Sequence, residues 1–338
     1  MKSTYAICSS AALVIGSLTL FASTSVQAQN FELKATHFLP PNHAFHKELT
    51  RWGDDLAKKS NGRLTIKVFP SGQMGPTPRQ FDLVRTGVAD IGVGLSGASP
   101  GRFPMTEVSN LPFVVTESSR SSKLMTELAP KYVGQEYAGV KLLQIILTPP
   151  LKFHMTKARL NTLADFKGLR IRYAGELFAE SIKAFGGTPV AVPPGEVVDA
   201  MSKGTVDGAM FPHEGAQSFQ VSTVAKFSYE PGINAASFFW VMNPASYEKL
   251  PADLRALIDQ TTGAANAERI GKELDDAEVE GRKHLESKGV QLVTFSEAMR
   301  RDMTNVVKPI IDTTISKLEA KGQPARQFYD ALVKGGTR

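Results

Sequence analysis

Residues 165–211 read DFKGLRIRYAGELFAESIKAFGGTPVAVPPGEVVDAMSKGTVDGAMF, and this stretch decides the fold class. Apolar and charged residues alternate over 170–173, which predicts a half-buried strand, and apolar residues at i, i+4 and i+7 within 178–185 predict an amphipathic helix. Two further short strands and a second helix follow, so the unit is predicted to be β-α-β-α-β. In open α/β sheets, ligands bind where strands end and helices begin. Arg172, at the end of the first strand, is therefore the leading candidate for a ligand-binding residue.

The N-terminus has the features of a secretory signal peptide. Lys2 precedes a largely apolar run over 11–22, and a small-x-small cleavage site ends at Ala28. We therefore predict that residues 1–28 are a signal peptide and that the mature chain is exported to the periplasm. No later segment is long and apolar enough to span a bilayer, so we expect a protein that is not membrane-embedded. An uncleaved N-terminal anchor is the alternative.

Cysteine content and charge exclude several classes of protein. The one cysteine, Cys8, lies in the leader, so the mature chain has no thiol for disulfides, catalysis or metal ligation. The chain has 39 Lys and Arg against 33 Asp and Glu, and no basic run is interleaved with aromatic residues. We therefore expect no nucleic-acid partner. A modest positive charge would still favour the approach of an anionic ligand.

The beginning of the mature chain predicts a parallel sheet. Alternation over 31–37 and 64–68 predicts two strands, and the apolar spacing within 45–56 predicts a helix between them. Such a βαβ unit implies parallel strands and a right-handed crossover. The glycines within 92–97 fit the spacing G-x-G-x-x-G, but a loop rich in Pro and Gly follows where a phosphate-binding helix would begin. We interpret them as points of close backbone approach or tight packing rather than as a dinucleotide site.

Later segments predict how the chain is divided. Residues 148–150 are a plausible crossover to a second lobe and residues 229–232 a plausible return, after which 238–242 suit a strand buried on both faces. Residues 251–287 predict one long or slightly broken helix that could brace both lobes. Residues 296–333 predict further amphipathic helix, which Pro309 should kink or restart.

Two α/β lobes joined by two crossovers is the plan of a periplasmic binding protein that closes by hinge motion. We predict this fold class, with hinge crossovers and a long bracing helix. Residues 29–148 and about 237–276 are assigned to lobe I. Residues 149–236 and about 277–338 are assigned to lobe II.

Four short motifs follow one another along the chain: FPSGQMG at 69–75, LPF at 111–113, DFKGLRIR at 165–172 and TVDG at 205–208. Together with the leader, they resemble the DctP-type substrate-binding proteins of tripartite ATP-independent periplasmic (TRAP) transporters. The resemblance implies an organic acid ligand, a membrane permease as partner, and pairing of Arg172 with the ligand carboxylate. A planar guanidinium suits this role because it offers two parallel donors. We expect Arg170 to be exposed.

Three departures from the sialic-acid-binding members of that family bear on the ligand. Leu95 stands where they have a glutamate, Leu151 where they have a second arginine, and Phe211 where they have an asparagine. A polyhydroxylated acid needs such partners, because buried hydroxyls without hydrogen bonds are costly. A sugar acid is therefore disfavoured. The favoured ligand is a monocarboxylic 2-oxo or 2-hydroxy acid with an apolar or aromatic body.

Further residues are candidates for the binding site. A pocket of Leu95 and Phe211 is predicted to extend to aromatic residues, for each of which core packing is the alternative: Phe38, Tyr173, Phe238 and Trp240. His37, at the end of the first strand, is a candidate polar contact. Lys152 could replace the missing arginine charge, which keeps a small C4-type dicarboxylate as the alternative ligand.

Two other kinds of function are weaker readings. The histidines at 37, 43 and 46 match no zinc spacing, and His213-Glu214 lacks the second histidine of H-E-x-x-H because Gln217 stands there. An exported hydrolase is the main rival, yet no G-x-S-x-G motif occurs, and the acidic pair at 275–276 lies on a charged helix. We therefore expect a binding protein without catalytic residues, metal or cofactor.

Overall fold

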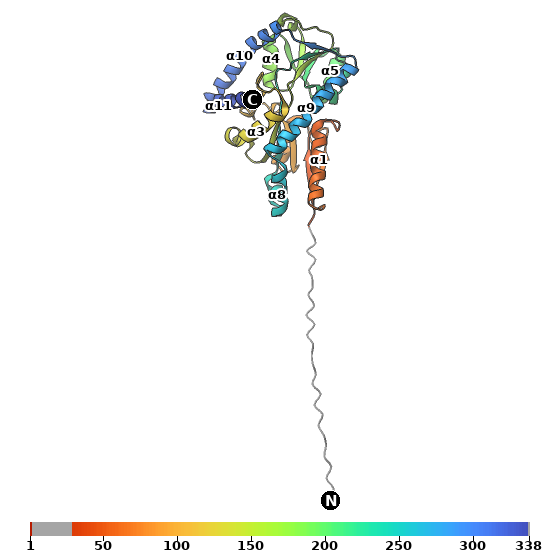
Figure 1. Cartoon of the computed structure of the whole chain (residues 1–338), viewed down its shortest axis with the longest axis vertical. Coiled ribbons are helices and arrows are strands. Elements are labelled where there is room, and N and C mark those ends of the chain that lie inside the picture. Colours follow the sequence, from red (N-terminus) through yellow and green to blue (C-terminus); the bar gives the residue numbers. More distant parts are fainter. Residues whose placement is uncertain (2–28, 337–338) are drawn as a thin grey trace.

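The computed structural model describes residues 1 and 29–336, and the predicted signal peptide therefore lies almost wholly outside the described residues. The fold is α/β with two lobes, each built around one mixed sheet (Figure 1). The first sheet has the strand order β2-β1-β3-β10-β4, with β1 Phe31–Thr36, β2 Leu64–Phe69, β3 Ile91–Leu95, β4 Lys141–Leu147 and β10 Ser237–Met242. The second has the order β11-β9-β5-β8-β6-β7, with β5 Lys152–Met155, β6 Arg170–Tyr173, β7 Thr188–Ala191, β8 Gly208–Phe211, β9 Phe227–Glu230 and β11 Gln291–Thr294.

Helices surround both sheets. The α-helices are α1 Ala44–Lys59, α2 Gln80–Arg85, α3 Ser118–Tyr132, α4 Glu176–Phe185, α5 Val197–Ser202, α6 His213–Ser218, α7 Pro244–Glu248, α8 Ala252–Thr261, α9 Ala264–Ser287, α10 Glu297–Glu319 and α11 Ala325–Gly336. Short 3-10 turns are η1 Thr77–Arg79, η2 Ser96–Ala98, η3 Thr106–Asn110, η4 Gly134–Tyr137, η5 Leu163–Phe166, η6 Pro194–Glu196 and η7 Val221–Thr223. None of the helices within residues 29–336 combines the length and the apolar content that a membrane span needs.

The unit predicted from residues 165–211 is confirmed. Strand β6 pairs in parallel with both β7 and β8, and α4 buries Phe178, Ile182 and Phe185. Strand β8 begins at Gly208, three residues later than the alternation suggested, because the preceding residues form the turn that ends α5. Arg172 lies in β6 between Val190 and Ala209 of the neighbouring strands.

The parallel pairing of β1 with β2 is also confirmed, but the first sheet is mixed. Strand β10 lies antiparallel between β3 and β4. It is buried along its whole length, as predicted. Strand β10 runs in this direction because the chain enters it from the connection that returns from the second lobe. Strand β5 likewise enters the second sheet antiparallel to both of its neighbours.

The two connections between the lobes lie side by side. Thr148 donates its N–H to the carbonyl of Ala236 at 2.9 Å, and Leu151 donates to Asn234 at 2.7 Å. The return connection lies later than predicted, because Tyr229 and Glu230 belong to β9 and the crossing segment follows them. These hydrogen bonds hold the two connecting segments against each other where the chain crosses between the lobes.

Helix α9 contacts elements of both lobes and runs obliquely between them (Figure 1). A Cβ at Gly271 would overlap the backbone at the start of α3, and a Cβ at Gly281 would overlap the backbone at the start of α6. Beside each glycine an acidic side chain accepts from the N-terminal amides of the helix it touches. Asp275 accepts from Ser118 and Ser119 at 2.7 and 2.9 Å, and Glu278 accepts from Glu214 at 3.0 Å.

The C-terminal helices differ from the prediction in one respect. Pro309 lies inside α10 without restarting it, and the break falls at residues 320–324 instead. Helix α10 contacts α4, whereas α11 contacts α3 of the first lobe. The exact boundaries of the lobes therefore stay a prediction.

The G-x-G-x-x-G run is a packing feature, as interpreted from its context. Gly94 lies on β3 against the buried ring of Phe239, which also packs on Phe81 and Phe103 at 5.7 and 5.3 Å between ring centroids. We expect Gly94→Ala to lower the free energy of unfolding by about 1 to 3 kcal/mol, because overpacking forces the ring to move. Gly195→Ala, at a position with open space around the added Cβ, is the control. Urea unfolding measures both, and equal stability of the two variants would contradict this packing role.

Candidate ligand-binding site

A cavity between the two lobes brings together most of the predicted site residues. It encloses about 520 Å³, counting the part that is open to solvent. The first lobe contributes Phe38, Leu95 and Phe238, and the second contributes Arg172 and Phe211. Apolar side chains make up most of the remaining wall: Leu39, Pro149, Leu151, Ala174, Pro194, Met210, Pro212, Phe219, Ala236 and Leu274.

Arg172 is fixed at the end of β6 by hydrogen bonds and by an aromatic ring. Its Nε donates to the carbonyl of Val192 at 3.1 Å, and its Nη1 donates to the carbonyl of Met210 at 3.3 Å. The guanidinium lies over the ring of Phe211, 4.5 Å from the ring centroid. These contacts hold the guanidinium in one orientation before any ligand arrives.

The charge of Arg172 has no counter-ion among residues 29–336. Its side chain is only 3% exposed, yet no acidic side chain among the described residues forms an ion pair with it. Burial lowers the pKa of the guanidinium to about 9, from an ordinary value of 12.5. A buried, unpaired cation is unfavourable, and Nη2 has no hydrogen-bond partner among the described residues. The group is therefore suited to accept a carboxylate from outside.

Arg170 provides the contrast two residues earlier. It is exposed, as expected, and its guanidinium is paired with Asp207 at 3.0 Å. Its backbone N–H also donates to Asp207 at 2.8 Å, so this arginine serves to tie β6 to the segment before β8. The alternation along the strand places one arginine in solvent and the other in the cavity.

Aromatic rings form two opposite walls of the cavity. Phe38 stacks on Phe238 with 6.0 Å between ring centroids and 17° between planes. Across the cavity, Phe211 packs on Phe219 at 5.5 Å. The positions of Leu95 and Leu151 are apolar and lie in the wall. Such a lining offers few hydrogen bonds and favours an apolar body for the ligand.

Four predicted site residues do not line this cavity. Trp240 is buried beneath it, with its ring 6.2 Å from Phe45 and 6.5 Å from Trp52 between centroids. The ammonium of Lys152 forms an ion pair with Glu278. The remaining two are His37 and Tyr173.

His37 is buried and is not among the residues that line the ligand cavity. Its Nε2 is 3.0 Å from Nδ1 of His46, and its Nδ1 accepts from the N–H of Leu39 at 3.1 Å. Burial, together with the neighbouring histidines, lowers the pKa of His37 to about 3. Tyr173 lines an adjoining cavity that shares Arg172 and Leu95 with the first.

Sequence reasoning did not assign three polar residues to the cavity wall, namely His43, Thr148 and Glu214. His43 is the N-cap of α1, where its Nδ1 accepts from the N–H of Phe45 at 3.2 Å, and its Nε2 lies 3.3 Å from the Glu214 carboxylate. Thr148 accepts through Oγ1 from the N–H of Ala236 at 3.0 Å. The position of His43 just before an amphipathic helix could have predicted an N-cap, but histidine is not among the usual N-cap residues. Within residues 29–336, no group of three or more His, Cys, Asp or Glu is arranged to hold a metal ion.

Comparisons with known proteins agree with this geometry. The chain is similar to a TRAP solute-binding protein from Rhodoferax ferrireducens T118 in complex with copurified benzoate, with 27% identity, coverage of 90% of this chain and 97% of that chain, and a TM-score of 0.87. It is similar to a TRAP periplasmic solute-binding protein from Bordetella bronchiseptica with bound (R)- and (S)-mandelate, with 27% identity, coverage of 90% and 98%, and a TM-score of 0.85. It is also 25% identical to the 2,3-diketo-L-gulonate-binding periplasmic protein YiaO of Escherichia coli, over 85% of this chain and 90% of that protein.

The family follows from a match that covers most of the chain. Residues 35–318 match the family described as bacterial extracellular solute-binding protein, family 7 (DctP). The two solved structures named above are TRAP solute-binding proteins with the same two-lobed fold. The resemblance inferred from the short motifs is thereby confirmed, and the chain belongs to the DctP family of TRAP solute-binding proteins.

Proposed function

We propose that this protein captures an organic monocarboxylate with an apolar or aromatic body in the periplasm and delivers it to a TRAP permease in the membrane. A 2-oxo or 2-hydroxy acid is the favoured ligand. The observation that carries the proposal is the buried guanidinium of Arg172, which pairs with no acidic group of the described chain and lies in a cavity with aromatic walls. The relatives with benzoate and mandelate support an aromatic acid.

The alternatives have less support in the cavity. A C4-type dicarboxylate would need a second cation, and the ammonium of Lys152 already pairs with Glu278. A sugar acid, of the kind named for the Escherichia coli relative, would place hydroxyls against Leu95, Leu151 and Phe211, which cannot hydrogen-bond through their side chains. A hydrolase would require an activated nucleophile or a catalytic acid pair at the cavity. Glu214 is the one acidic residue in its wall, and we propose binding without turnover.

A ligand screen tests the proposal. We expect thermal stabilisation by phenylglyoxylate, mandelate and benzoate, and none by succinate or glucuronate at the same concentration. A ligand at 1,000 times its Kd stabilises the folded state by about 4 kcal/mol. Chromatography of the recovered acid should show no product. Stabilisation by glucuronate or succinate alone would contradict the proposed ligand class, and product formation would contradict the binding function.

Phe211→Asn should weaken mandelate binding by about tenfold or more, because the variant loses the ring under the guanidinium and places an amide in an apolar wall. Phe227→Leu, an aromatic change remote from the cavity in the same lobe, is the control. Isothermal titration calorimetry measures both. If Phe211→Asn binds mandelate with unchanged affinity, Phe211 has no role in binding.

A further inference from the structure

The carboxylate of Glu214 reaches from the second lobe to the first. Glu214 lies in α6, which begins two residues after the cavity residue Phe211. Its Oε1 accepts from the backbone N–H of Ala44 at 3.0 Å, and its Oε2 lies 3.3 Å from Nε2 of His43. Ala44 and His43 form the start of α1 in the first lobe. The side chain of Glu214 is thus the cap of a helix that belongs to the other lobe.

Helix α1 has no acidic side chain of its own at its N-terminus, and Glu214 supplies the negative charge there. This N-terminus carries the positive end of the helix dipole. The N-cap side chain of His43 already serves the N–H of Phe45 through Nδ1. Its Nε2 therefore carries the hydrogen and lies 3.3 Å from the Glu214 carboxylate. When the lobes separate, the N–H groups of α1 and the Glu214 carboxylate lose these direct bonds and are hydrated instead.

Two other contacts join the lobes around the cavity. Asn42 donates through Nδ2 to the carbonyl of Ser218 at 3.1 Å, next to the Glu214 contact. A Cβ placed on Gly97 would be 2.9 Å from the carbonyl oxygen of Ala174 and 3.1 Å from the Cα of Gly175, so here the two backbones touch. The arrangement of the lobes is a closed one.

Glu214 also forms a boundary between the ligand cavity and the outside. It lines the cavity that contains Arg172, and it lines a second, polar groove formed with Asn42, Lys47 and Glu273. Its side chain is buried, with Glu214 only 5% exposed. The contact with α1 thus covers one side of the cavity.

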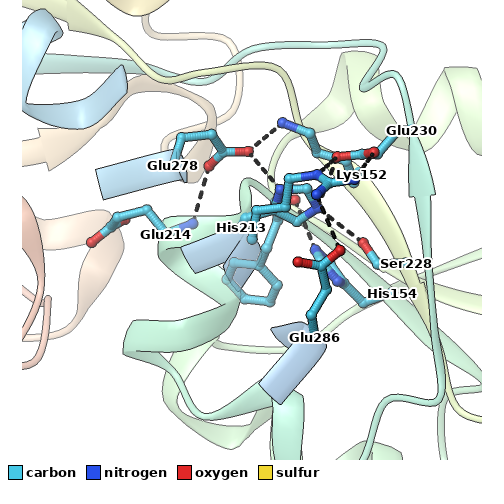
Figure 2. A network of polar contacts seen from close by, with 10 residues as sticks. Lys152, His154, His213, Glu214, Ser228, Glu230, Glu278 and Glu286 are labelled. Carbon is cyan, nitrogen blue, oxygen red and sulfur yellow. Dashed lines mark hydrogen bonds and ion pairs between the residues drawn. The ribbon is translucent and has the colours of Figure 1, made fainter. Parts of the chain in front are cut away.

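The backbone of Glu214 is held by the bracing helix. Glu278 of α9 accepts from the N–H of Glu214 at 3.0 Å and lies 3.3 Å from Nδ1 of His213, and it is also paired with Lys152 (Figure 2). Gly281 lets α9 approach this segment closely. Figure 2 shows the Glu214 side chain directed away from this network. The network fixes the start of α6, and the Glu214 carboxylate points towards the first lobe, where it accepts from Ala44.

We propose that Glu214 is a positioning residue for ligand capture, a latch that caps α1 across the cleft and stabilises the closed form of the protein. This inference rests on the proposed function, in which capture requires closure. A contact present only in the closed form shifts the equilibrium between open and closed forms, and ligand affinity rises with the closed fraction. Glu214 acts through this equilibrium and requires no contact with the ligand.

The test combines binding with a direct measurement of closure. The only cysteine lies in the leader, so spin labels can be placed at two new cysteines, Lys58→Cys in the first lobe and Lys203→Cys in the second, both exposed. Glu214→Ala is compared with Glu214→Gln, which keeps the acceptor for Ala44, and with Glu180→Ala, which removes an exposed carboxylate from the same lobe. Pulsed electron spin resonance then gives the distance between lobes with and without mandelate.

We expect Glu214→Ala to weaken mandelate binding by about 10- to 100-fold, mainly through faster dissociation, and to increase the open fraction of the ligand-free protein. Glu214→Gln should recover part of both effects, and Glu180→Ala should match the wild type. Wild-type distances and mandelate affinity in Glu214→Ala would overturn the latch. If the wild type does not bind mandelate, the proposed ligand class fails, but the ligand-free distances still decide the latch: a Glu214→Ala distribution identical to the wild type overturns it.

Discussion

Arg172→Ala is expected to weaken acid binding severely, and at the upper end of the expected loss nearly to abolish it. A micromolar Kd corresponds to about 8 kcal/mol, and truncating one partner of a desolvated charge pair costs about 2 to 5 kcal/mol, or roughly 30- to 4,000-fold in affinity. The guanidinium is held by the carbonyls of Val192 and Met210 so that its remaining donors face the ligand. Arg172→Lys should also bind poorly, because one ammonium can neither hold both carbonyls nor present a fork to a carboxylate.

Stability separates this loss from unfolding. Arg172→Met removes a buried cation for which the described part of the chain supplies no counter-ion, and this relief offsets the loss of two hydrogen bonds to neutral carbonyls. The melting temperature of ligand-free Arg172→Met is therefore expected not to fall below that of the wild type. Arg170→Ala is the matched control, since that guanidinium pairs with Asp207 in solvent and should leave binding intact. Calorimetric affinity near the wild type for Arg172→Ala or Arg172→Lys would refute the role of Arg172.

Acid is expected to destabilise the folded protein, with an onset near pH 6.5. Burial lowers the pKa of His37, His154 and His213 to about 3 each. Below pH 6.5 the unfolded chain binds protons that the folded chain does not, so stability is complete above that pH and is lost as the pH falls towards 3. Each such histidine lowers the free energy of unfolding by about 1.4 kcal/mol for each pH unit below 6.5.

Glu107 acts in the opposite direction. Burial, with the charges of Glu176 and Glu136, raises the pKa of Glu107 to about 7, so the folded state gains stability as the pH falls from 7 to 4.5. For these four groups taken alone, three histidines against one glutamate give a loss of about 3 kcal/mol per pH unit between 6.5 and 4.5. That is a large share of a typical stability of about 5 to 15 kcal/mol.

Urea unfolding at pH 7.5, 6.5 and 5.5 measures this dependence. His154→Gln keeps a donor for the carbonyl of Phe211, which Nε2 of His154 contacts at 3.1 Å, and should flatten the slope by about 1.4 kcal/mol per pH unit. Glu107→Gln should make the slope steeper. A stability that does not change between pH 7.5 and 5.5 would show that these histidines are not kept neutral by the fold.

Local sequence patterns were sufficient for much of the fold. Periodicity placed β1, α1, β2 and the unit from β6 to β8, because each of these elements buries one face. The same reasoning placed Arg172 at a strand end, and the closing lobes then bring Phe38, Leu95 and Phe238 to it. Short strands were missed. Strands β5 and β11 were not predicted, although β6 to β8 are equally short, and β9 was interpreted as a connection because a proline follows it.

Contacts between distant segments could not be predicted from local pattern. Phe238 and Trp240 share one face of β10, but alternation does not say how far along a strand a cavity extends, and only Phe238 reaches it. Lys152 follows the hinge, and its pairing with Glu278 requires α9 to be in place. The bond between Ala44 and Glu214 joins residues 170 positions apart and exists only because the lobes meet.

The two glycines of α9 mean that this helix sets a distance between its two contact points in addition to bracing the lobes. From Gly271 to Gly281 is ten residues (281 − 271), or about 15 Å of helix and just under three turns. This fixed length sets the separation between the starts of α3 and α6. One residue inserted between Gly271 and Glu278 would turn Glu278 by about 100° relative to Gly271 and move it off the amide of Glu214. Chain length within this part of α9 is thus constrained in a way that its largely polar surface does not reveal.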